Sequence, residues 1–292
     1  MTLRRTISGL ASLHLFFRVD CIVYCEGGEQ LSEREIFSGN GDDQTLDVFF
    51  WSSISKFLQA KRSYHFKSVG NKAVLKSIAA DLDRSKIDSV LVCLDRDYDW
   101  LCGKQIESPR VVYSYGYSWE SDVVCPICFE RLFFRTVTRT PAAEKAMQKA
   151  LLHFEKFARD LVRWCEADIA LFARHLELVL VRDKPMASLD VSGQFPVLNV
   201  TRIRAQLVKI GLSRRPRRLV SVQPAEVMRH VWGKLASRFL YHLFVKVVGS
   251  QSLRMTYELF MRLMISEMVS TMSEGFTTDK RAYFQSLSIA FS

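Results

Sequence analysis

Three aspartates at alternate positions, Asp95, Asp97 and Asp99, follow a short apolar run at residues 90–94. The run reads Val-Leu-Val-Cys-Leu, which is aliphatic and too short for a helix, so it predicts a buried strand that ends at the carboxylates. In open parallel sheets, functional groups collect just beyond the carboxyl ends of strands. Carboxylates gathered there repel one another, and a hard divalent cation is the simplest group that offsets this repulsion. The pattern therefore predicts a cation site.

Another acidic side chain, Glu26, follows a second apolar run at residues 19–25. The next two residues are Gly27 and Gly28, and paired glycines after a strand mark a tight turn where backbone passes close to another group. Right-handed crossovers bring the carboxyl ends of parallel strands to the same edge of a sheet. If the two strands are neighbours, we expect Glu26 to converge with Asp95 and the aspartates that follow it.

An all-oxygen cluster of this kind suits Mg²⁺ or Mn²⁺, which then share the oxygens of a phosphate. Such an ion orients a scissile phosphodiester, positions a hydroxide and offsets charge on the leaving oxygen. Glu26 would then be a metal ligand or a general base. Acidic residues also follow strands simply as turn formers or helix caps, and Asp99 fits that local role as well. Asp-x-Asp alone is unspecific, whereas strand-Glu-Gly followed by strand-Asp-x-Asp is more specific.

The elements that must position these carboxylates alternate along the first part of the chain. Apolar runs predict strands, and apolar residues at helical spacing predict helices between them. This alternation indicates an α/β fold with a mainly parallel sheet and flanking helices. The expected strands are 19–25, 64–69, 90–94 and 109–113, and the expected helices are 46–58 and 73–82.

The pattern changes after residue 120, where helical spacing dominates. We therefore expect two domains, a catalytic α/β domain over 1–120 and a mostly α-helical domain over 121–292 for substrate, dimer or partner contacts. The methionine-rich stretch 255–272 is a candidate dimer or partner interface, although methionines at such spacing more often pack a helix. The expected helices are 129–134, 142–161, 162–176, 201–210, 224–248 and 252–272.

The 292-residue chain carries 41 basic against 31 acidic residues, a formal net charge of +10. This excess favours a polyanionic partner, either nucleic acid or an anionic membrane surface. No apolar stretch is long enough for a transmembrane helix, so no membrane-spanning segment is expected. Lys72 is a candidate phosphate contact or simply a solvated lysine at a helix start. A basic segment could track a phosphate backbone or form a solvated face, and its candidate nucleic-acid contacts are Arg214, Arg215, Arg217 and Arg218.

The cysteines and the N-terminus favour a cytoplasmic location. Seven cysteines, several of them in expected strands, suit a reducing compartment. Cys125 and Cys128 form a lone CxxC without a convincing second ligand pair, so two buried thiols near a helix start are expected in place of a zinc site. The basic and apolar N-terminus is interrupted by Arg18 and Asp20 and has no small-residue cleavage site, so export is not expected.

The sequence also resembles a known family. Ile-Val-Tyr-Cys-Glu-Gly-Gly at 22–28 and Val-Leu-Val-Cys-Leu-Asp-Arg-Asp at 90–97 resemble the TOPRIM fold of topoisomerases, primases and overcoming-lysogenization-defect nucleases. Residues 94–99 and Tyr-Gly-Tyr-Ser-Trp-Glu at 115–120 narrow the similarity to TOPRIM-like nucleases of bacterial antiphage defence, which have a helical C-terminal half and are found beside ABC-type ATPases. Trp-Gly-Lys at 232–234, near an expected helix start, is a further similarity.

This resemblance implies metal-dependent phosphodiester cleavage, with Glu26, Asp95 and Asp97 in a Mg²⁺ or Mn²⁺ centre, Asp99 as a further ligand candidate and Glu120 at the edge of the site. It also implies a toxic effector of abortive infection that an ATPase partner restrains and phage sensing releases. RNA, tRNA in particular, would be the substrate, and the active form would be a homodimer.

One departure from the family pattern concerns the acid that usually follows Glu-Gly closely at the start of the first helix. Residues 29–46 read as an insertion at this place, which leaves Asp47 as the displaced equivalent. A second hypothesis is a catalytically idle TOPRIM-like module that binds nucleic acid or regulates a partner. A topoisomerase is disfavoured, because it needs a nucleophilic tyrosine on a dedicated domain and a longer chain.

Overall fold

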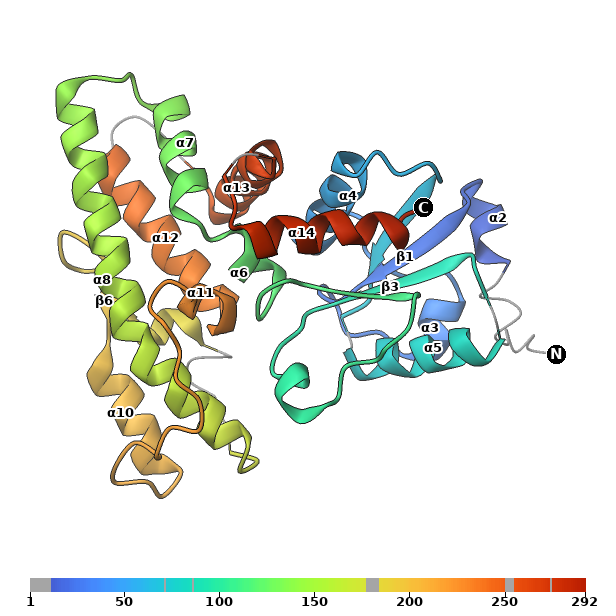
Figure 1. Ribbon diagram of the computed structural model, residues 1–292, viewed down its shortest axis with the longest axis horizontal. Helices are drawn as coiled ribbons and strands as arrows, with labels where there is room; N and C mark the ends of the chain where they lie inside the picture. Colours follow the sequence, from blue (N-terminus) through green and yellow to red (C-terminus); the bar gives the residue numbers. More distant parts are fainter. Residues whose placement is uncertain (1–11, 71, 86, 177–183, 250–254, 274) are drawn as a thin grey trace. The chain divides into compact units, whose positions relative to one another are not determined.

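The computed structural model describes residues 12–70, 72–85, 87–176, 184–249, 255–273 and 275–292 (Figure 1). The basic N-terminal residues 1–11 and the start of the helix expected over 252–272 lie outside them. The chain forms two compact units that interleave along the sequence. The first holds Met1–Arg96, Lys104–Tyr115 and Val269–Ser292, and the second holds Asp97–Gly103 and Gly116–Met268. The expected boundary at residue 120 therefore differs from these units, because the chain crosses between them four times.

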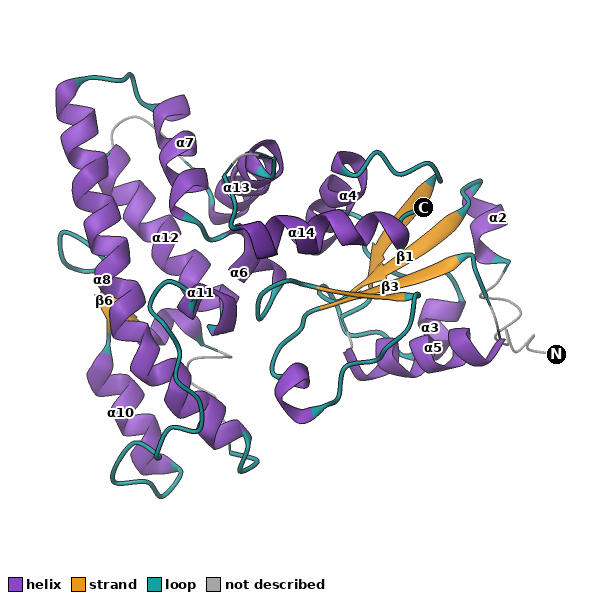
Figure 2. Cartoon of the chain, in the orientation of Figure 1, coloured by secondary structure: helices purple, strands orange, loops and turns teal. Residues whose placement is uncertain are grey.

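The first unit is built on a four-stranded sheet in which every pairing is parallel, as the sequence predicts (Figure 2). The central strands are buried along their whole length, which is typical of a parallel sheet covered on both faces. Their order is β2-β1-β3-β4, so β1 and β3 are direct neighbours and Cys25 pairs with Cys93. The bounds are β1 Cys21–Cys25, β2 Tyr64–Ser68, β3 Val90–Leu94 and β4 Val111–Tyr113.

Helices cover both faces of this sheet (Figure 2). Helices α2 (Leu13–Phe17), α3 (Glu33–Phe37) and α5 (Lys72–Ser85) contribute to one core with the alternate side chains of β1 and β3 that point towards them. On the other face lie α4 (Leu46–Phe57) and α14 (Thr278–Ser286), the latter followed by the short turn η3 (Leu287–Ile289). The C-terminal residues thus complete the α/β unit, although the sequence pattern assigned them to the helical part.

The second unit is mostly helical, as expected. Two expected helices, 142–161 and 162–176, are one continuous helix, because no glycine or proline interrupts the pattern after Pro141. The helix expected over 224–248 is divided in two, since Val231 and Trp232 adopt extended and irregular backbone conformations. The helices are α6 Trp119–Val123, α7 Pro126–Thr136, α8 Pro141–Phe172, α10 Val200–Lys209, α11 Val227–His230, α12 Gly233–Val248 and α13 Tyr257–Thr271, whose end lies in the first unit.

Short elements complete the second unit. A turn of 3₁₀ helix, η1 (Asp99–Cys102), begins at the last of the three aspartates. A second turn, η2 (Pro185–Ser188), precedes a two-stranded antiparallel ribbon of β5 (Leu189–Asp190) and β6 (Val197–Leu198). Within the described residues, every helix is too short or too polar to cross a membrane.

Candidate active site

Glu26 and Asp95 meet at the carboxyl ends of β1 and β3, as the strand order requires. The Glu26 carboxylate accepts the backbone N–H of Asp95 at 3.1 Å, and the Glu26 N–H donates to the Cys93 carbonyl, also at 3.1 Å. Both side chains are half-buried. The expected convergence of these two positions is therefore present in the first unit.

Asp47 joins this edge from the start of α4. Thr45 caps the helix through its hydroxyl, which accepts the Val48 N–H at 3.3 Å, and this fixes Asp47 in the first turn. A Cβ atom placed on Gly27 would lie 2.5 Å from Asp47 Oδ1, so the carboxylate sits directly against the Gly27 backbone. Gly27 has a φ of 112°, which also favours glycine. The residue expected as the displaced acid thus lies beside the Glu26-Gly27 turn.

The negative charge of this edge acts on the pKa of the buried Cys25 thiol. Burial holds the pKa of Cys25 well above its ordinary value of 9.0, and a hydrogen bond to Cys93 and the carboxylates of Asp47 and Asp95 raise it further. Both aspartates are therefore close enough to act on one buried group. Three carboxylates, those of Glu26, Asp47 and Asp95, come from three elements to the same sheet edge.

Lys72 brings a positive charge to the same edge. Its ammonium group donates to the backbone carbonyl of Asp95 at 2.6 Å, so this side chain is engaged at the acidic edge. The ammonium partly offsets the repulsion between the carboxylates, the task that the sequence assigned to a cation.

The turn after Asp95 is anchored from the far end of the chain. Arg96 donates its backbone N–H to the Ser114 hydroxyl at 3.0 Å, and its guanidinium lies 5.5 Å from the ring centroid of Tyr283 on α14. The Tyr283 hydroxyl donates to the Tyr113 carbonyl. Tyr283 therefore helps to hold the Asp95 turn. Sequence reasoning missed this residue because no local pattern connects it with β3.

Asp97 belongs to the second unit and has an unusual backbone. Its φ is 47°, a left-handed value that is uncommon outside glycine, asparagine and aspartate. Its N–H donates to the Tyr117 carbonyl at 2.7 Å, and the Tyr117 N–H donates to the Arg229 carbonyl at 2.8 Å. Asp99 begins η1, and its side chain is buried, with an exposed fraction of 8 %.

Glu120 lies on α6, and its side chain is only 5 % exposed. The Ser118 hydroxyl donates to its carboxylate at 2.5 Å. Burial raises the pKa of Glu120 above the ordinary value of 4.5; the Ser118 hydrogen bond and the Lys234 ammonium oppose this rise, and the Asp97 carboxylate adds to it. The second unit thus brings Asp97, Glu120 and Lys234 within electrostatic reach of one another.

Lys234 reaches this group because α12 starts directly against α6. A Cβ atom on Gly233 would lie 2.8 Å from the Ser121 backbone nitrogen, so only glycine permits this approach. The Trp232 indole N–H donates to the buried Asp168 carboxylate at 2.9 Å, which fixes the residue before Gly233. Sequence reasoning gave Lys234 no role in the site, although the Trp-Gly-Lys triplet at a helix start was the available signal.

The raised pKa of Glu120 predicts a pH-dependent stability. A carboxyl group whose pKa is higher in the folded than in the unfolded protein stabilises the fold at low pH, and this contribution is lost as pH rises from about 4.5 through the folded pKa. We therefore expect Glu120→Gln to raise the melting temperature relative to wild type by an amount that grows with pH across this window. Thermal melts at several pH values, with Glu226→Gln at an exposed position of the same unit as control, check this. A constant difference at all pH values would contradict it.

The oxygen donors at the first-unit edge suit a hard divalent cation in chemical type. In the described part of the chain, no three His, Cys, Asp or Glu side chains are grouped closely enough to hold an ion by themselves. Mg²⁺ is usually bound by one or two carboxylates, with water and substrate phosphate completing its shell. Glu26 and Asp95 meet that smaller requirement, and Asp47 lies next to them.

The remaining residues that the sequence singled out belong to the second unit. Arg214, Arg215, Arg217 and Arg218 are all exposed in the segment after α10. Cys125 caps α7, with its sulfur accepting the Cys128 N–H at 3.4 Å, while the Cys128 side chain is buried. Both cysteines lie at a helix start as expected, but only Cys128 is buried, whereas Cys125 is half-buried.

No protein-family model matches the chain, and no curated protein matches it. The assignment of chemistry therefore depends on the residues themselves, above all on those at the carboxyl ends of β1 and β3.

Proposed function

We propose that this protein is a metal-dependent endonuclease with a TOPRIM-like catalytic unit. The observation that carries the proposal is the hydrogen bond between the Glu26 carboxylate and the Asp95 backbone at the ends of two adjacent parallel strands. It joins the two motifs on which the resemblance to TOPRIM-like nucleases depends. The net charge of +10 adds support, because a phosphodiester substrate is a polyanion.

In this proposal Glu26 and Asp95 hold Mg²⁺ or Mn²⁺, with Asp47 beside them. A bound ion of this type stabilises negative charge on the scissile phosphate and the leaving oxygen. The Lys72 ammonium attracts the phosphate to the sheet edge, and its hydrogen bond to the Asp95 carbonyl keeps the Asp95 backbone in place. Asp97, Asp99 and Glu120 are further candidates for the catalytic set, on the basis of the resemblance.

The biological part of the proposal comes from the same resemblance, which extends to AriB, the nuclease effector of the PARIS antiphage system. We propose that the chain is the toxic effector of such a system, that it cleaves host RNA, tRNA in particular, and that an ABC-type ATPase restrains it until infection. The proposed active form is a homodimer in the cytoplasm.

The decisive experiment incubates the purified protein with tRNA, other cellular RNA, single-stranded DNA and duplex DNA, each with Mg²⁺ or with EDTA. We expect RNA to be cleaved with Mg²⁺ and not with EDTA. Sequencing of RNA ends after induced expression should show the same cleavage sites in cells. Cleavage that persists in EDTA would remove the metal mechanism. Tight binding of RNA without cleavage would favour the idle binding module instead.

A further inference from the structure

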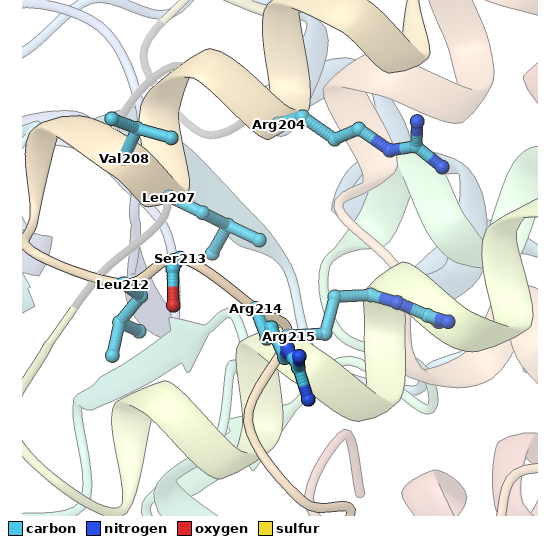
Figure 3. A pocket seen from close by; sticks show the side chains of 7 residues that line it. All are labelled: Arg204, Leu207, Val208, Leu212, Ser213, Arg214 and Arg215. Carbon is cyan, nitrogen blue, oxygen red and sulfur yellow. The ribbon is translucent and has the colours of Figure 1, made fainter.

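The exposed arginines of the second unit are not one uniform basic face. Three of them, Arg204, Arg214 and Arg215, line a single hollow of about 530 Å³ (Figure 3). Arg204 comes from α10, whereas the other two come from the segment that follows this helix. The volume lies within the range of roughly 300 to 1,000 Å³ that is common for small-molecule sites.

One wall of this hollow is apolar. Leu207 and Val208 come from α10 and Leu212 from the turn after it, and Ser213 adds a hydroxyl (Figure 3). Leu207 is buried with 3 % exposure, while Val208 is 65 % exposed, so the wall runs from the core of the unit to its surface. Guanidinium groups beside an apolar wall suit a ligand that has both an anionic group and a flat apolar face.

Arg215 is held in place by a contact with helix α8. Its guanidinium lies 5.6 Å from the ring centroid of Trp164, a fully buried residue of α8. A guanidinium held near an aromatic ring by a cation–π interaction can still direct its N–H groups to a phosphate, which it binds in bidentate fashion. The segment is tied to α8 a second time, because the Val222 N–H donates to the Glu166 carboxylate at 3.1 Å. The hollow therefore has an anchored wall.

The charge of the hollow is uncompensated within the described residues: no acidic side chain there forms an ion pair with Arg204, Arg214 or Arg215. Three positively charged side chains that line one hollow attract an anionic ligand. A smaller hollow of about 290 Å³ beside α10 has only Arg202 and Lys209 as charged lining residues, together with Ala187, Ala205 and Gln206.

We infer that the hollow between α10 and the segment after it binds one unstacked nucleotide of a single-stranded RNA. The phosphate lies on the guanidinium groups of Arg204, Arg214 and Arg215, and the base lies on the apolar wall. The inference rests on the proposed function for the choice of RNA, and it deepens that proposal: the protein selects an RNA segment whose bases are unpaired and free to leave the stack.

Binding is measured with the full-length protein in EDTA by fluorescence anisotropy of a short labelled single-stranded RNA. We expect Arg204→Ala/Arg214→Ala to weaken binding about tenfold, as is usual for lost charge-assisted hydrogen bonds. The control Lys145→Ala/Lys149→Ala removes the same charge from exposed positions on α8 of the same unit and should weaken binding less than about twofold. Arg204→Lys/Arg214→Lys keeps the positive charges but loses the forked guanidinium groups. It should therefore bind RNA more tightly than the alanine double variant and more weakly than wild type.

Two further ligands test the identity of the occupant. A base-free ribose-phosphate strand of the same length should bind wild type about tenfold more weakly than the RNA, and Val208→Asp should remove this difference. Polyglutamate should compete poorly. The inference would be overturned if wild type bound the two strands equally well, or if the arginine and lysine double variants lost RNA affinity equally. It would also be overturned if polyglutamate competed as well as unlabelled RNA, and that result would favour an acidic protein partner.

These results are separable from those of the proposed function. If binding in EDTA depends on the bases but no RNA is cleaved in Mg²⁺, the nucleotide site is supported and the nuclease proposal is wrong. Mg²⁺-dependent cleavage by a protein that binds both strands equally would do the reverse. Circular dichroism of each variant shows whether its fold is retained, and a variant that is folded yet binds like wild type counts against the site.

Discussion

Glu26→Gln is expected to reduce Mg²⁺-dependent RNA cleavage by about 10²–10³-fold, the usual cost of removing one charge-stabilising group from a catalytic centre. Glutamine has nearly the same shape as glutamate, and its amide oxygen can still accept the Asp95 N–H that lies 3.1 Å from the native carboxylate. The substitution therefore removes the negative charge and leaves the contact between β1 and β3. Cleavage rates at saturating RNA, together with the survival of cells that express each variant, measure the effect.

The control for this prediction is Glu29→Gln, which makes the same chemical change at an exposed position three residues along the chain. It should cleave RNA at the wild-type rate, and both variants should melt at the wild-type temperature. If Glu26→Gln cleaves RNA and harms cells as strongly as wild type does, Glu26 is not part of the centre. If both variants lose activity equally, the loss reflects the charge of the whole turn, and Glu26 has no special role.

Gly233→Ala is expected to destabilise the second unit by about 2 kcal/mol, although alanine is the better helix former. Alanine gains up to about 1 kcal/mol over glycine within a helix. At this position the added Cβ would lie 2.8 Å from the Ser121 nitrogen and 2.9 Å from Glu120 Cβ, and the first of these is backbone that cannot rotate away. Overpacking of this kind typically costs about 1–3 kcal/mol or more, so the contact outweighs the helix propensity.

The comparison for Gly233→Ala is Gly193→Ala, where the nearest atom to an added Cβ is the Phe195 carbonyl oxygen at an ordinary 3.7 Å. We expect this control to change the free energy of unfolding by less than about 0.5 kcal/mol. Urea denaturation of both variants measures the difference. A Gly233→Ala protein as stable as wild type would show that α6 and α12 separate at little cost, and the placement of Lys234 beside Glu120 would then carry no weight.

Much of the α/β unit could be predicted from the sequence, because the signals are local. The run at 90–94 is apolar at every position, which indicates a strand buried on both faces, and this is how β3 lies in the sheet. Glu26 and Asp95 could be paired in advance because parallel strands with right-handed crossovers end at one edge. The function that these residues serve remains a prediction.

Other parts depended on contacts that no local pattern encodes. Asp47 lies about twenty residues after Glu26 in the sequence, and only the packing of α4 against the Gly27 turn shows that its carboxylate lies against Gly27. Helix α14 was not among the helices expected from the sequence, and no local pattern shows that its Tyr283 donates to the Tyr113 carbonyl of the same unit. The predicted boundary at residue 120 differs from the observed units for the same reason, since the chain returns to the first unit at Val269.

The three aspartates after β3 show which features the sequence determines and which depend on tertiary structure. The sequence by itself determined that a buried strand ends there and that carboxylates follow it, because burial and backbone preference act over a few neighbouring residues. Tertiary structure decided what each carboxylate contacts: Asp95 lies beside Glu26, Asp97 takes a left-handed conformation under Tyr117 and near Glu120, and Asp99 begins a helical turn. Those partners come from segments far apart in the chain, and only the packing of the folded protein selects among them.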